Sequence, residues 1–226
     1  MRIRLKNINR HFIDRSVAAF SAQLPSGARV MDIGAGDEHY RHLFAEQTYF
    51  ALDRGYGQSS HAGLDVIADV RMIPCAEGGI DAAICVEVIE HVFETTQLLG
   101  ELSRVIRPGG HLLLTSPLCF GEHMPPWDFY RFTRFALEKL LTDAKFEIES
   151  LEARGGFFML TAYLVARIPD ELMRNLQAHW YAKPLKVVAR MLCTYFLAPL
   201  LLALDPLDRQ QRFTLGYVCI ARRTSD

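Results

Sequence analysis

The sequence of 226 residues lacks an excess of charge of either sign. Its 25 Lys and Arg residues nearly balance its 26 Asp and Glu residues. Proteins that bind nucleic acid usually carry a basic excess, so we expect no nucleic-acid partner. Half of the residues are hydrophobic and 23% are charged, a composition that excludes disordered and collagen-like proteins.

Cysteine is scarce and irregularly placed. The five cysteines include no Cys-x-x-Cys pair, so the pattern of a zinc knuckle or a thioredoxin-like redox site is missing. The sequence MRIRLKNINRHF at 1–12 also lacks the apolar stretch of a signal peptide. These absences predict an intracellular, cytoplasmic protein with reduced cysteines.

One long apolar run, residues 187–204 (VVARMLCTYFLAPLLLAL), is interrupted only by an arginine and a proline. A buried helix on the sheet or a seam between two copies would explain it, so a homodimer stays open. Alternatively, residues 183–204 contact a membrane peripherally, with Lys183, Lys186 and Arg190 toward the lipid headgroups. A full membrane span is the third alternative, but a span needs ~20 apolar residues and the proline breaks this run.

Short apolar segments alternate with helical patterns along most of the chain. Strands are expected at 29–33, 49–52, 65–68, 80–86, 111–116, 146–152 and 213–221. Helices are expected at 9–24, 40–46, 92–105 and 133–144. This alternation predicts an α/β fold in which helices cover both faces of a mostly parallel sheet.

Residues 157–210 interrupt the alternation, because they contain no strand pattern. Helices are expected there at 157–168, 170–179 and 184–204. The predicted organisation is an N-terminal helical segment, a core domain in two pieces and a helical insertion, at 1–27, at 28–156 with 211–226, and at 157–210.

The most informative motif follows the first expected strand, which ends in Asp32-Ile-Gly34-Ala-Gly36. The glycines let a ligand approach the backbone, and amides at the start of a helix point outward. Asp53 and Asp69 follow the next two strands, and the carboxyl ends of parallel strands meet at one edge of a sheet. The three acids and the turn predict an adenosine pocket, although Gly-x-Gly alone also occurs in simple tight turns.

A dinucleotide is the alternative ligand of such a turn. Its fingerprint needs a third glycine where this sequence has His39. Asp32 would also repel a pyrophosphate, whereas it could support a ligand that carries a positive charge. The pattern therefore favours a cationic nucleoside over the nicotinamide cofactor of an oxidoreductase.

Five ordered segments resemble the class I S-adenosylmethionine-dependent methyltransferases, over roughly residues 28–152. They are VMDIGAGDEHY (30–40), ALDR (51–54), ADVRMIP (68–74), IDAAICVEVIEHV (80–92) and ELSRVIRPGGHLLLTSP (101–117). The resemblance implies a Rossmann-like, doubly wound sheet of seven strands, mostly parallel with an antiparallel last strand, in a methyltransferase domain at 28–156 and 211–226. It also implies a methyltransferase with S-adenosylmethionine as cofactor and S-adenosylhomocysteine as product.

The same resemblance implies a set of cofactor-binding residues. The glycine turn would approach the methionine part of the cofactor, Asp53 would hold the ribose, and Asp69 would contact the adenine. The whole set is Asp32, Gly34, Ala35, Gly36, Asp53, Arg54, Asp69, Val70, Val86 and Glu87. The family usually has a third glycine at the position of Glu38, where a side chain would be tolerated if it points to solvent.

The loop after the fifth expected strand is the predicted acceptor site. It contains prolines and reads CFGEHMPPWDFYRF at 119–132. Trp127, Tyr130 and Arg131 would bind the acceptor. His123 would act as the catalytic general base, because the ordinary pKa of histidine lies near neutrality. The alternative is that the aromatic side chains only pack the loop against the body and that His123 is a surface residue.

Acids and histidines after the fourth expected strand raise a second hypothesis. Glu87-x-x-Glu90-His91, together with His123, resembles the metal site of some methyltransferases that act on RNA ends or on quinone precursors. Carboxylates and imidazoles can bind a divalent ion. The interpretation that we prefer is that the acids cap the following helix.

The predicted function is methyl transfer to a small molecule or to an envelope glycan or lipid. Oxygen is preferred over nitrogen or carbon as the atom that receives the methyl group. Enzymes that methylate the amino groups of bases carry an Asn/Asp-Pro-Pro-aromatic segment where this sequence reads Val86-Glu87-Val88-Ile89. The alternative is a protein on the same fold that binds S-adenosylmethionine without catalysis.

Overall fold

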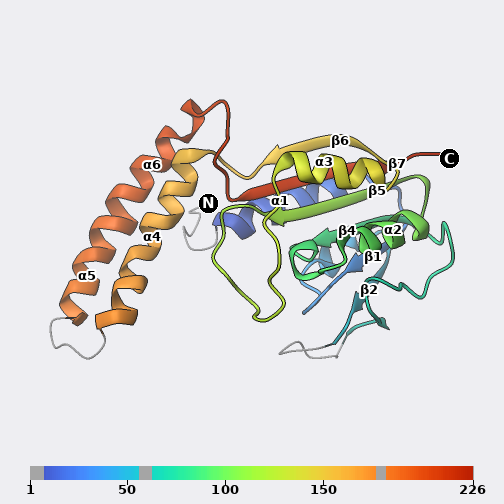
Figure 1. Ribbon diagram of the computed structural model, residues 1–226, viewed down its shortest axis with the longest axis horizontal. Helices are drawn as coiled ribbons and strands as arrows, with labels where there is room; N and C mark the ends of the chain where they lie inside the picture. The colour runs from blue at the N-terminus through green and yellow to red at the C-terminus, as the bar shows by residue number, and fades with distance from the viewer. Residues whose placement is uncertain (1–7, 56–62, 177–181, 226) are drawn as a thin grey trace. The chain divides into compact units, whose positions relative to one another are not determined.

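The computed structural model describes residues 8–55, 63–176 and 182–225. Within them, seven strands form one sheet in the order β3-β2-β1-β4-β5-β7-β6 (Figure 1). The strands are β1 Arg29–Ile33, β2 Thr48–Asp53, β3 Val66–Ile67, β4 Ile80–Val86, β5 Ile106–Pro117, β6 Phe146–Ala153 and β7 Gly216–Arg223. The pairings from β3 to β5 are parallel, whereas β7 is antiparallel to β5. The predicted doubly wound α/β sheet, mostly parallel with an antiparallel last strand, is confirmed.

Helices cover both faces of this sheet. The helices are α1 Ile8–Ser21, α2 Thr95–Val105 and α3 Arg134–Asp143, with short 3-10 turns at Arg41–Phe44 and Ile89–His91. In Figure 1, α2 and α3 lie in front of the sheet and α1 lies behind it. On α1, Ile13, Val17 and Phe20 recur at helical spacing and pack into the core with strand residues such as Val30 and Ile84.

The strands at the centre of the sheet are continuous apolar runs because both of their faces are covered. All but the first residue of β1 and five of the seven residues of β4 are buried. The structure differs from expectation at β5, which begins at Ile106 and not at residue 111. A register shift between Ile80 and Ala82 lets the strand continue through Pro108-Gly109-Gly110 as an irregularity.

Residues 157–176 and 182–207 form helices. They are α4 Phe157–Leu176, α5 Ala182–Leu192, a π-helical turn at Cys193–Leu197, α6 Ala198–Leu204 and a 3-10 turn at Asp205–Leu207. The expected break between 157–168 and 170–179 is wrong, because α4 continues through Pro169. The end of the expected helix at 170–179 lies outside the described residues.

The two ends of this helical segment are tied together by acids that cap α4. Asp205 accepts hydrogen bonds from the amides of Gly156, at 3.2 Å, and Met159, at 2.7 Å. Asp208 accepts one from the amide of Phe157 at 2.7 Å. Carboxylates stabilise the first turn of a helix, where amides have no helical acceptor.

The contacts divide the chain into two compact units. One contains Ile13–Glu152 and Gly216–Asp226, and the other contains Ala153–Leu215 together with the chain up to Phe12. These divisions fall after Phe12, inside α1, after Glu152 and after Leu215, and the expected domain organisation, with boundaries after residues 27, 156 and 210, stays a prediction.

Candidate functional site

The glycine turn leaves the carboxyl end of β1. The amides of Gly34 and Ala35 both donate to the carbonyl of Leu52 in β2, at 2.8 and 3.0 Å. Gly34 has a φ of +74°, and a Cβ added there would lie 2.5 Å from a methyl group of Val88. Position 34 therefore needs glycine both for its backbone conformation and for the close approach of the chain after β4.

Asp53 lies at the end of β2 and holds this turn in place. Its carboxylate accepts hydrogen bonds from the amide of Gly36 at 3.1 Å and from the amide of Gly55 at 2.9 Å. The side chain stays partly exposed. The structure thus brings together Gly36 and Asp53, two residues of the predicted cofactor site.

Asp32 is buried below the turn and accepts a hydrogen bond from the hydroxyl of Tyr49. Burial raises the pKa of Asp32 to about 7, although the Tyr49 bond favours the ionised form. Tyr49 was not among the predicted site residues. Tyr49 lies opposite Val30 in the parallel pair of β1 and β2, and this register places it near Asp32. The contact could be predicted only from the pairing register of the two strands, which the sequence does not give.

The third strand-end acid, Asp69, lies in a network of arginines. It accepts hydrogen bonds from Arg54 at 2.8 Å and from Arg71 at 2.8 and 3.0 Å. These charge-assisted bonds, that from Arg71 foremost, hold the pKa of Asp69 below its usual range. Val70 is buried next to it. An adenine contact by Asp69 stays a prediction, because its carboxylate already binds two guanidinium groups.

Glu38 does not point to solvent, contrary to the condition set from the sequence. It has a φ of +55°, the left-handed region that explains the usual glycine. Its side chain is 14% exposed and pairs with Arg41, which also binds Asp65 at 2.7 Å. Gly63 makes room for it, since a Cβ there would overlap the Glu38 carboxylate.

The chain after β4 lies next to the glycine turn. Val86 ends the strand opposite Thr115 of β5. Glu87 has a φ of +53°; its amide donates to the Thr115 hydroxyl at 3.0 Å, and its carboxylate accepts from that hydroxyl at 2.9 Å. Thr115 fixes Glu87 through these two hydrogen bonds. A threonine in an apolar strand gives no sign of this role in the sequence.

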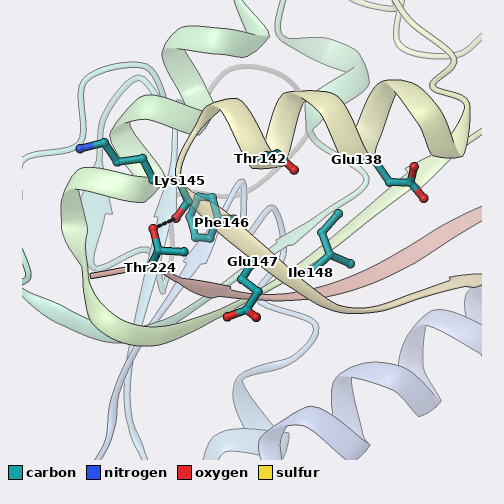
Figure 2. A pocket seen from close by; sticks show the side chains of 7 residues that line it. All are labelled: Glu138, Thr142, Lys145, Phe146, Glu147, Ile148 and Thr224. Carbon is teal, nitrogen blue, oxygen red and sulfur yellow. Dashed lines mark hydrogen bonds between the residues drawn. The ribbon is translucent and has the colours of Figure 1, made fainter. Parts of the chain in front are cut away.

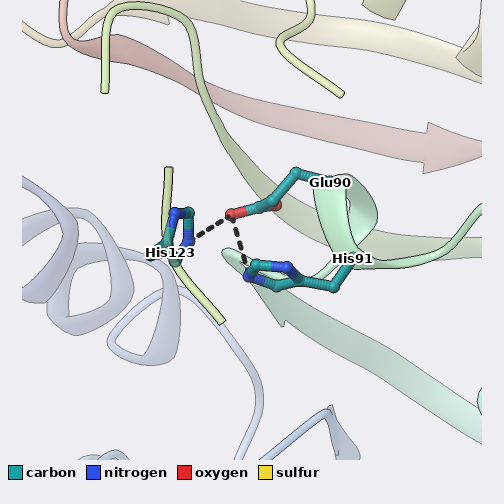
Figure 3. Close-up of side chains that lie close together, drawn as sticks. All are labelled: Glu90, His91 and His123. Carbon is teal, nitrogen blue, oxygen red and sulfur yellow. Dashed lines mark ion pairs between the residues drawn. The ribbon is translucent and has the colours of Figure 1, made fainter. Parts of the chain in front are cut away.

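Glu90, His91 and His123 form a cluster just beyond this point (Figure 3). One ligating atom from each lies within 4.8 Å of the others. The Nε2 atoms of His91 and His123 lie 3.8 and 4.0 Å from the same Glu90 oxygen. Glu87, by contrast, is not part of this cluster.

The second ring nitrogen of each histidine faces a backbone carbonyl. Nδ1 of His91 lies 2.5 Å from the Trp127 oxygen, and Nδ1 of His123 lies 3.2 Å from the Gly121 oxygen. A carbonyl only accepts, so each Nδ1 is the donor and each Nε2 presents a lone pair in the neutral ring. Burial lowers the pKa of His91 and thus favours its neutral form. Two imidazole nitrogens and a carboxylate are ligand types that hold a divalent cation in proteins.

The loop at 119–132 is held on this cluster by backbone and side-chain bonds. The amides of Phe129 and Tyr130 donate to the Glu90 carbonyl at 2.9 and 3.3 Å. Asp128 accepts from the amide of His123 at 2.9 Å and lies 3.5 Å from its Nδ1. Asp128 was not among the predicted site residues, although it lies between Trp127 and Arg131 in the sequence.

The three predicted acceptor-binding side chains of this loop differ in exposure and contacts. Trp127 is 53% exposed, and its ring lies 6.0 Å from the Arg54 guanidinium. The Tyr130 hydroxyl donates to the Phe93 carbonyl at 3.1 Å. Arg131 binds both Asp128 oxygens, at 2.7 and 2.8 Å, and holds the pKa of that carboxyl low. Arg131 therefore stiffens the loop, while Trp127 offers an exposed aromatic face.

A separate surface hollow lies over α3 and β6 (Figure 2). It shares no residue with the glycine turn, the histidine cluster or the loop. The lining residues are Glu138, Thr142, Lys145, Phe146, Glu147, Ile148 and Thr224. The Thr224 hydroxyl donates to the Lys145 carbonyl at 3.0 Å. The chemistry described above therefore does not involve this hollow.

Comparison with known proteins agrees with the geometry. A family model described as a methyltransferase domain matches residues 5–151. A probable S-adenosylmethionine-dependent methyltransferase of Mycolicibacterium smegmatis is 25% identical over 171 residues, which cover 64% of this chain and 66% of that protein. A tRNA (carboxymethyluridine(34)-5-O)-methyltransferase of Arabidopsis thaliana is 34% identical over 106 residues, which cover 44% of this chain and 26% of that protein. The chain thus spans less than two thirds of either relative.

A solved structure shares the fold and carries a relevant ligand. It is a 1,6-didemethyltoxoflavin-N1-methyltransferase of Burkholderia thailandensis with bound S-adenosylhomocysteine, 17% identical, with a TM-score of 0.56 over 94% of this chain and 78% of that chain. The family match covers more than half of the chain, and the glycine turn, the strand-end acids and the seven-stranded sheet agree with it. The protein therefore belongs to the class I S-adenosylmethionine-dependent methyltransferases.

Proposed function

We propose that the protein transfers a methyl group to a hydroxyl oxygen of a small molecule or of an envelope glycan or lipid. The observation that carries the proposal is the position of His123. His123 lies in the loop at 119–132, and two backbone amides of this loop donate to the Glu90 carbonyl. Glu90 comes two residues after Val88, which lies beside Gly34 of the cofactor turn. A proton acceptor and an exposed aromatic side chain are thus gathered at the carboxyl edge of the sheet.

Methyl transfer from a sulfonium needs alignment and a deprotonated acceptor. In the proposed step the acceptor oxygen forms a bond to the methyl carbon while the bond from that carbon to sulfur breaks. S-adenosylhomocysteine leaves, and the hydroxyl proton passes to Nε2 of His123. The Nδ1 contact to the Gly121 carbonyl leaves Nε2 as the basic atom.

Trp127, Tyr130 and Arg131 are the proposed acceptor-binding residues. The exposed ring of Trp127 would stack on an aromatic or sugar ring. Arg131 would act mainly through Asp128, which holds the His123 amide. A relative named as an O-methyltransferase supports oxygen as the acceptor atom, and its tRNA substrate is the reason to include RNA among the acceptors tested.

The proposed cofactor contacts keep the predicted roles. Asp53 would turn from the amide of Gly36 toward the ribose, and Asp32 would favour the positively charged end of the ligand through the turn. Val86 and Glu87 would lie below the sulfonium, because they come directly before Val88, which lies beside Gly34. Ala35 and Val70 would contribute backbone groups.

The test of this function compares His123→Ala with wild type and with His111→Ala, a partly exposed histidine on β5 outside the site. Each protein receives S-adenosylmethionine with a labelled methyl group and separate pools of phenols, glycans, lipids and RNA. We expect label that survives alkali, as an ether does, with wild type and His111→Ala. The rate should fall ~100-fold or more for His123→Ala. An unchanged rate for His123→Ala would exclude it as the base.

A divalent ion is the second role that the same side chains support. Metal-binding histidines commonly donate their other N–H to a backbone carbonyl, as His91 and His123 do here. Glu90, His91 and His123 would hold the ion, which would supply a positive charge that orients and acidifies a hydroxyl group. Glu87 would not take part, because Thr115 binds its carboxylate.

Titration with Co²⁺, followed by visible absorption, tests this role without reference to activity. We expect saturation at about one equivalent for wild type and for Glu87→Gln, and binding ~10-fold or more weaker for Glu90→Gln. Equal absorption changes for Glu87→Gln and Glu90→Gln would contradict the assignment. Binding of S-adenosylmethionine by all variants with no labelled product in any pool would favour the non-catalytic alternative.

A further inference from the structure

The helical segment Pro184–Leu207 has an apolar outer surface. It is 24 residues long, and its most apolar 18-residue window has a mean hydropathy of 2.0 and is 11% buried. Among the described residues it is the one helix long and apolar enough to cross a membrane by length and composition. The large apolar side chains that are 55–76% exposed include Val187, Met191, Leu192, Tyr195, Phe196 and Leu200.

The charged side chains of this segment point the other way, toward α4. The segment holds three charged residues, Lys186, Arg190 and Asp205. Asp170 of α4 lies 3.3 Å from Lys186 and 3.5 Å from Arg190. Asp205 is buried and caps the first turn of α4. All three charged side chains therefore form ion pairs or hydrogen bonds with α4.

Small side chains lie at the centre of the contact between the helices, and Leu201 and Leu202 pack against them. Ala162 and Ala166 of α4 and Ala198 of α6 form a buried cluster. A helix in water normally buries its apolar face and exposes its polar face. Small residues between helices, charges paired with one another and large apolar side chains outside are the arrangement expected of helices in lipid.

The width of the apolar surface distinguishes lipid from a second copy of the chain. Consecutive pairs, Val187 with Val188, Met191 with Leu192, and Tyr195 with Phe196, are all exposed. Two helices that pack together use a narrow stripe of about two residues in seven. A surface on which both members of each pair face outward covers about half of the helix circumference. Such a wide apolar surface is better covered by lipid chains than by one partner helix.

We propose that Pro184–Leu207 embeds this outer surface in a lipid bilayer. The segment is about 36 Å long at 1.5 Å per residue, against a hydrocarbon thickness of about 30 Å. Binding rests on apolar contact, since Asp170 already pairs with Lys186 and Arg190. The expectation that these basic side chains face lipid headgroups is therefore replaced by apolar insertion; the side chain of Lys183 lies outside the described residues.

The test uses the full chain and does not depend on methyl transfer. Protein purified in mild detergent is mixed with vesicles of phosphatidylcholine, with or without phosphatidylglycerol, and the detergent is removed before flotation. We expect wild type to float with both vesicles at low and high salt. Val187→Ser with Phe196→Ser should weaken partitioning at least ~10-fold.

The matched control removes equally exposed side chains elsewhere. Ile67 and Phe135 are 63% and 73% exposed, against 61% for Val187 and 76% for Phe196. The double change of Ile67→Ser with Phe135→Ser should leave flotation unchanged. Wild type that stays with the soluble fraction would overturn the proposal. So would a soluble dimer, seen by light scattering, that Val187→Ser with Phe196→Ser dissociates.

A conservative variant covers the case in which the serine variant does not fold. Phe196→Trp should gain blue-shifted fluorescence that brominated phosphatidylcholine quenches, relative to wild type. Phe135→Trp should show neither change. Equal quenching in the two tryptophan variants, or none in Phe196→Trp, would contradict insertion of this face.

Discussion

Asp32 shows how one buried side chain ties stability to pH. Its pKa is about 7 in the folded protein against an ordinary value of 3.8, because burial disfavours the charge. Between these pH values the native state holds a proton that the unfolded state has lost. The contribution of Asp32 to the free energy of unfolding therefore falls as pH rises from about 4 to 7, and is lower by about 4 kcal/mol above that range.

Replacing Asp32 with asparagine should remove this dependence. Asparagine has a similar shape, does not titrate and can still accept from Tyr49. Urea unfolding at pH 5 and pH 8 should show Asp32→Asn gaining about 2–4 kcal/mol relative to wild type at the higher pH. Asp37→Asn, at an exposed position of the same turn, should follow the wild-type profile. Parallel profiles for Asp32→Asn and wild type would refute the buried charge.

The glycine turn is the element that joins β1 to the cofactor site. Gly34 and Gly36 both have positive φ, at +74° and +54°. They differ in space, because a Cβ on Gly34 would meet Val88 whereas a Cβ on Gly36 would meet nothing within 4 Å. An alanine at position 36 therefore adds backbone strain alone, whereas an alanine at position 34 adds backbone strain and steric overlap.

Alanine at the two positions should have unequal effects. Gly36→Ala should lower the free energy of unfolding by ~1 kcal/mol through strain alone. Gly34→Ala should lower it by ~2–4 kcal/mol, since overlap with Val88 adds to the strain. Val88→Ala should recover part of the loss in the double variant, in a cycle measured by urea unfolding. Equal losses at positions 34 and 36, with no recovery, would show that the contact with Val88 is unimportant.

Strands whose own residues form an apolar run with clear ends could be predicted from the sequence. β1 and β4 begin and end where their apolar runs predict, because buried parallel strands are apolar on both faces. The start of β5 could not, because the shift near Ala82 depends on the partner strand. Pro169 does not end α4, although a proline inside a helix removes a hydrogen bond and usually predicts an end or a kink.

At the scale of the whole molecule, the sheet topology explains why distant residues share one site. Asp32 and Asp53 lie near the ends of β1 and β2, and His123 lies in the loop after β5; the carboxyl ends of these strands meet at one edge. That gathering follows from the sequence pattern. The engagement of Asp69 by Arg54 and Arg71 does not, because it depends on side-chain geometry between loops.

The helical unit shows the same limit for surface chemistry. Hydropathy identifies the run at 187–204, but it cannot tell a buried helix from an exposed one. The direction of Lys186, Arg190 and Asp205 toward α4 emerges only from the tertiary contacts. Those contacts distinguish an apolar outer surface from a core helix.

We propose that the glycine turn and Asp53 bind the methyl donor. Isothermal titration with S-adenosylhomocysteine tests it directly, using wild type, Asp53→Ala and Asp37→Ala. We expect micromolar binding by wild type and Asp37→Ala, and a loss of about 1–3 kcal/mol for Asp53→Ala, roughly 5- to 150-fold in affinity. Absence of binding by wild type, or wild-type affinity in Asp53→Ala, would show that the glycine turn and Asp53 do not form the cofactor site.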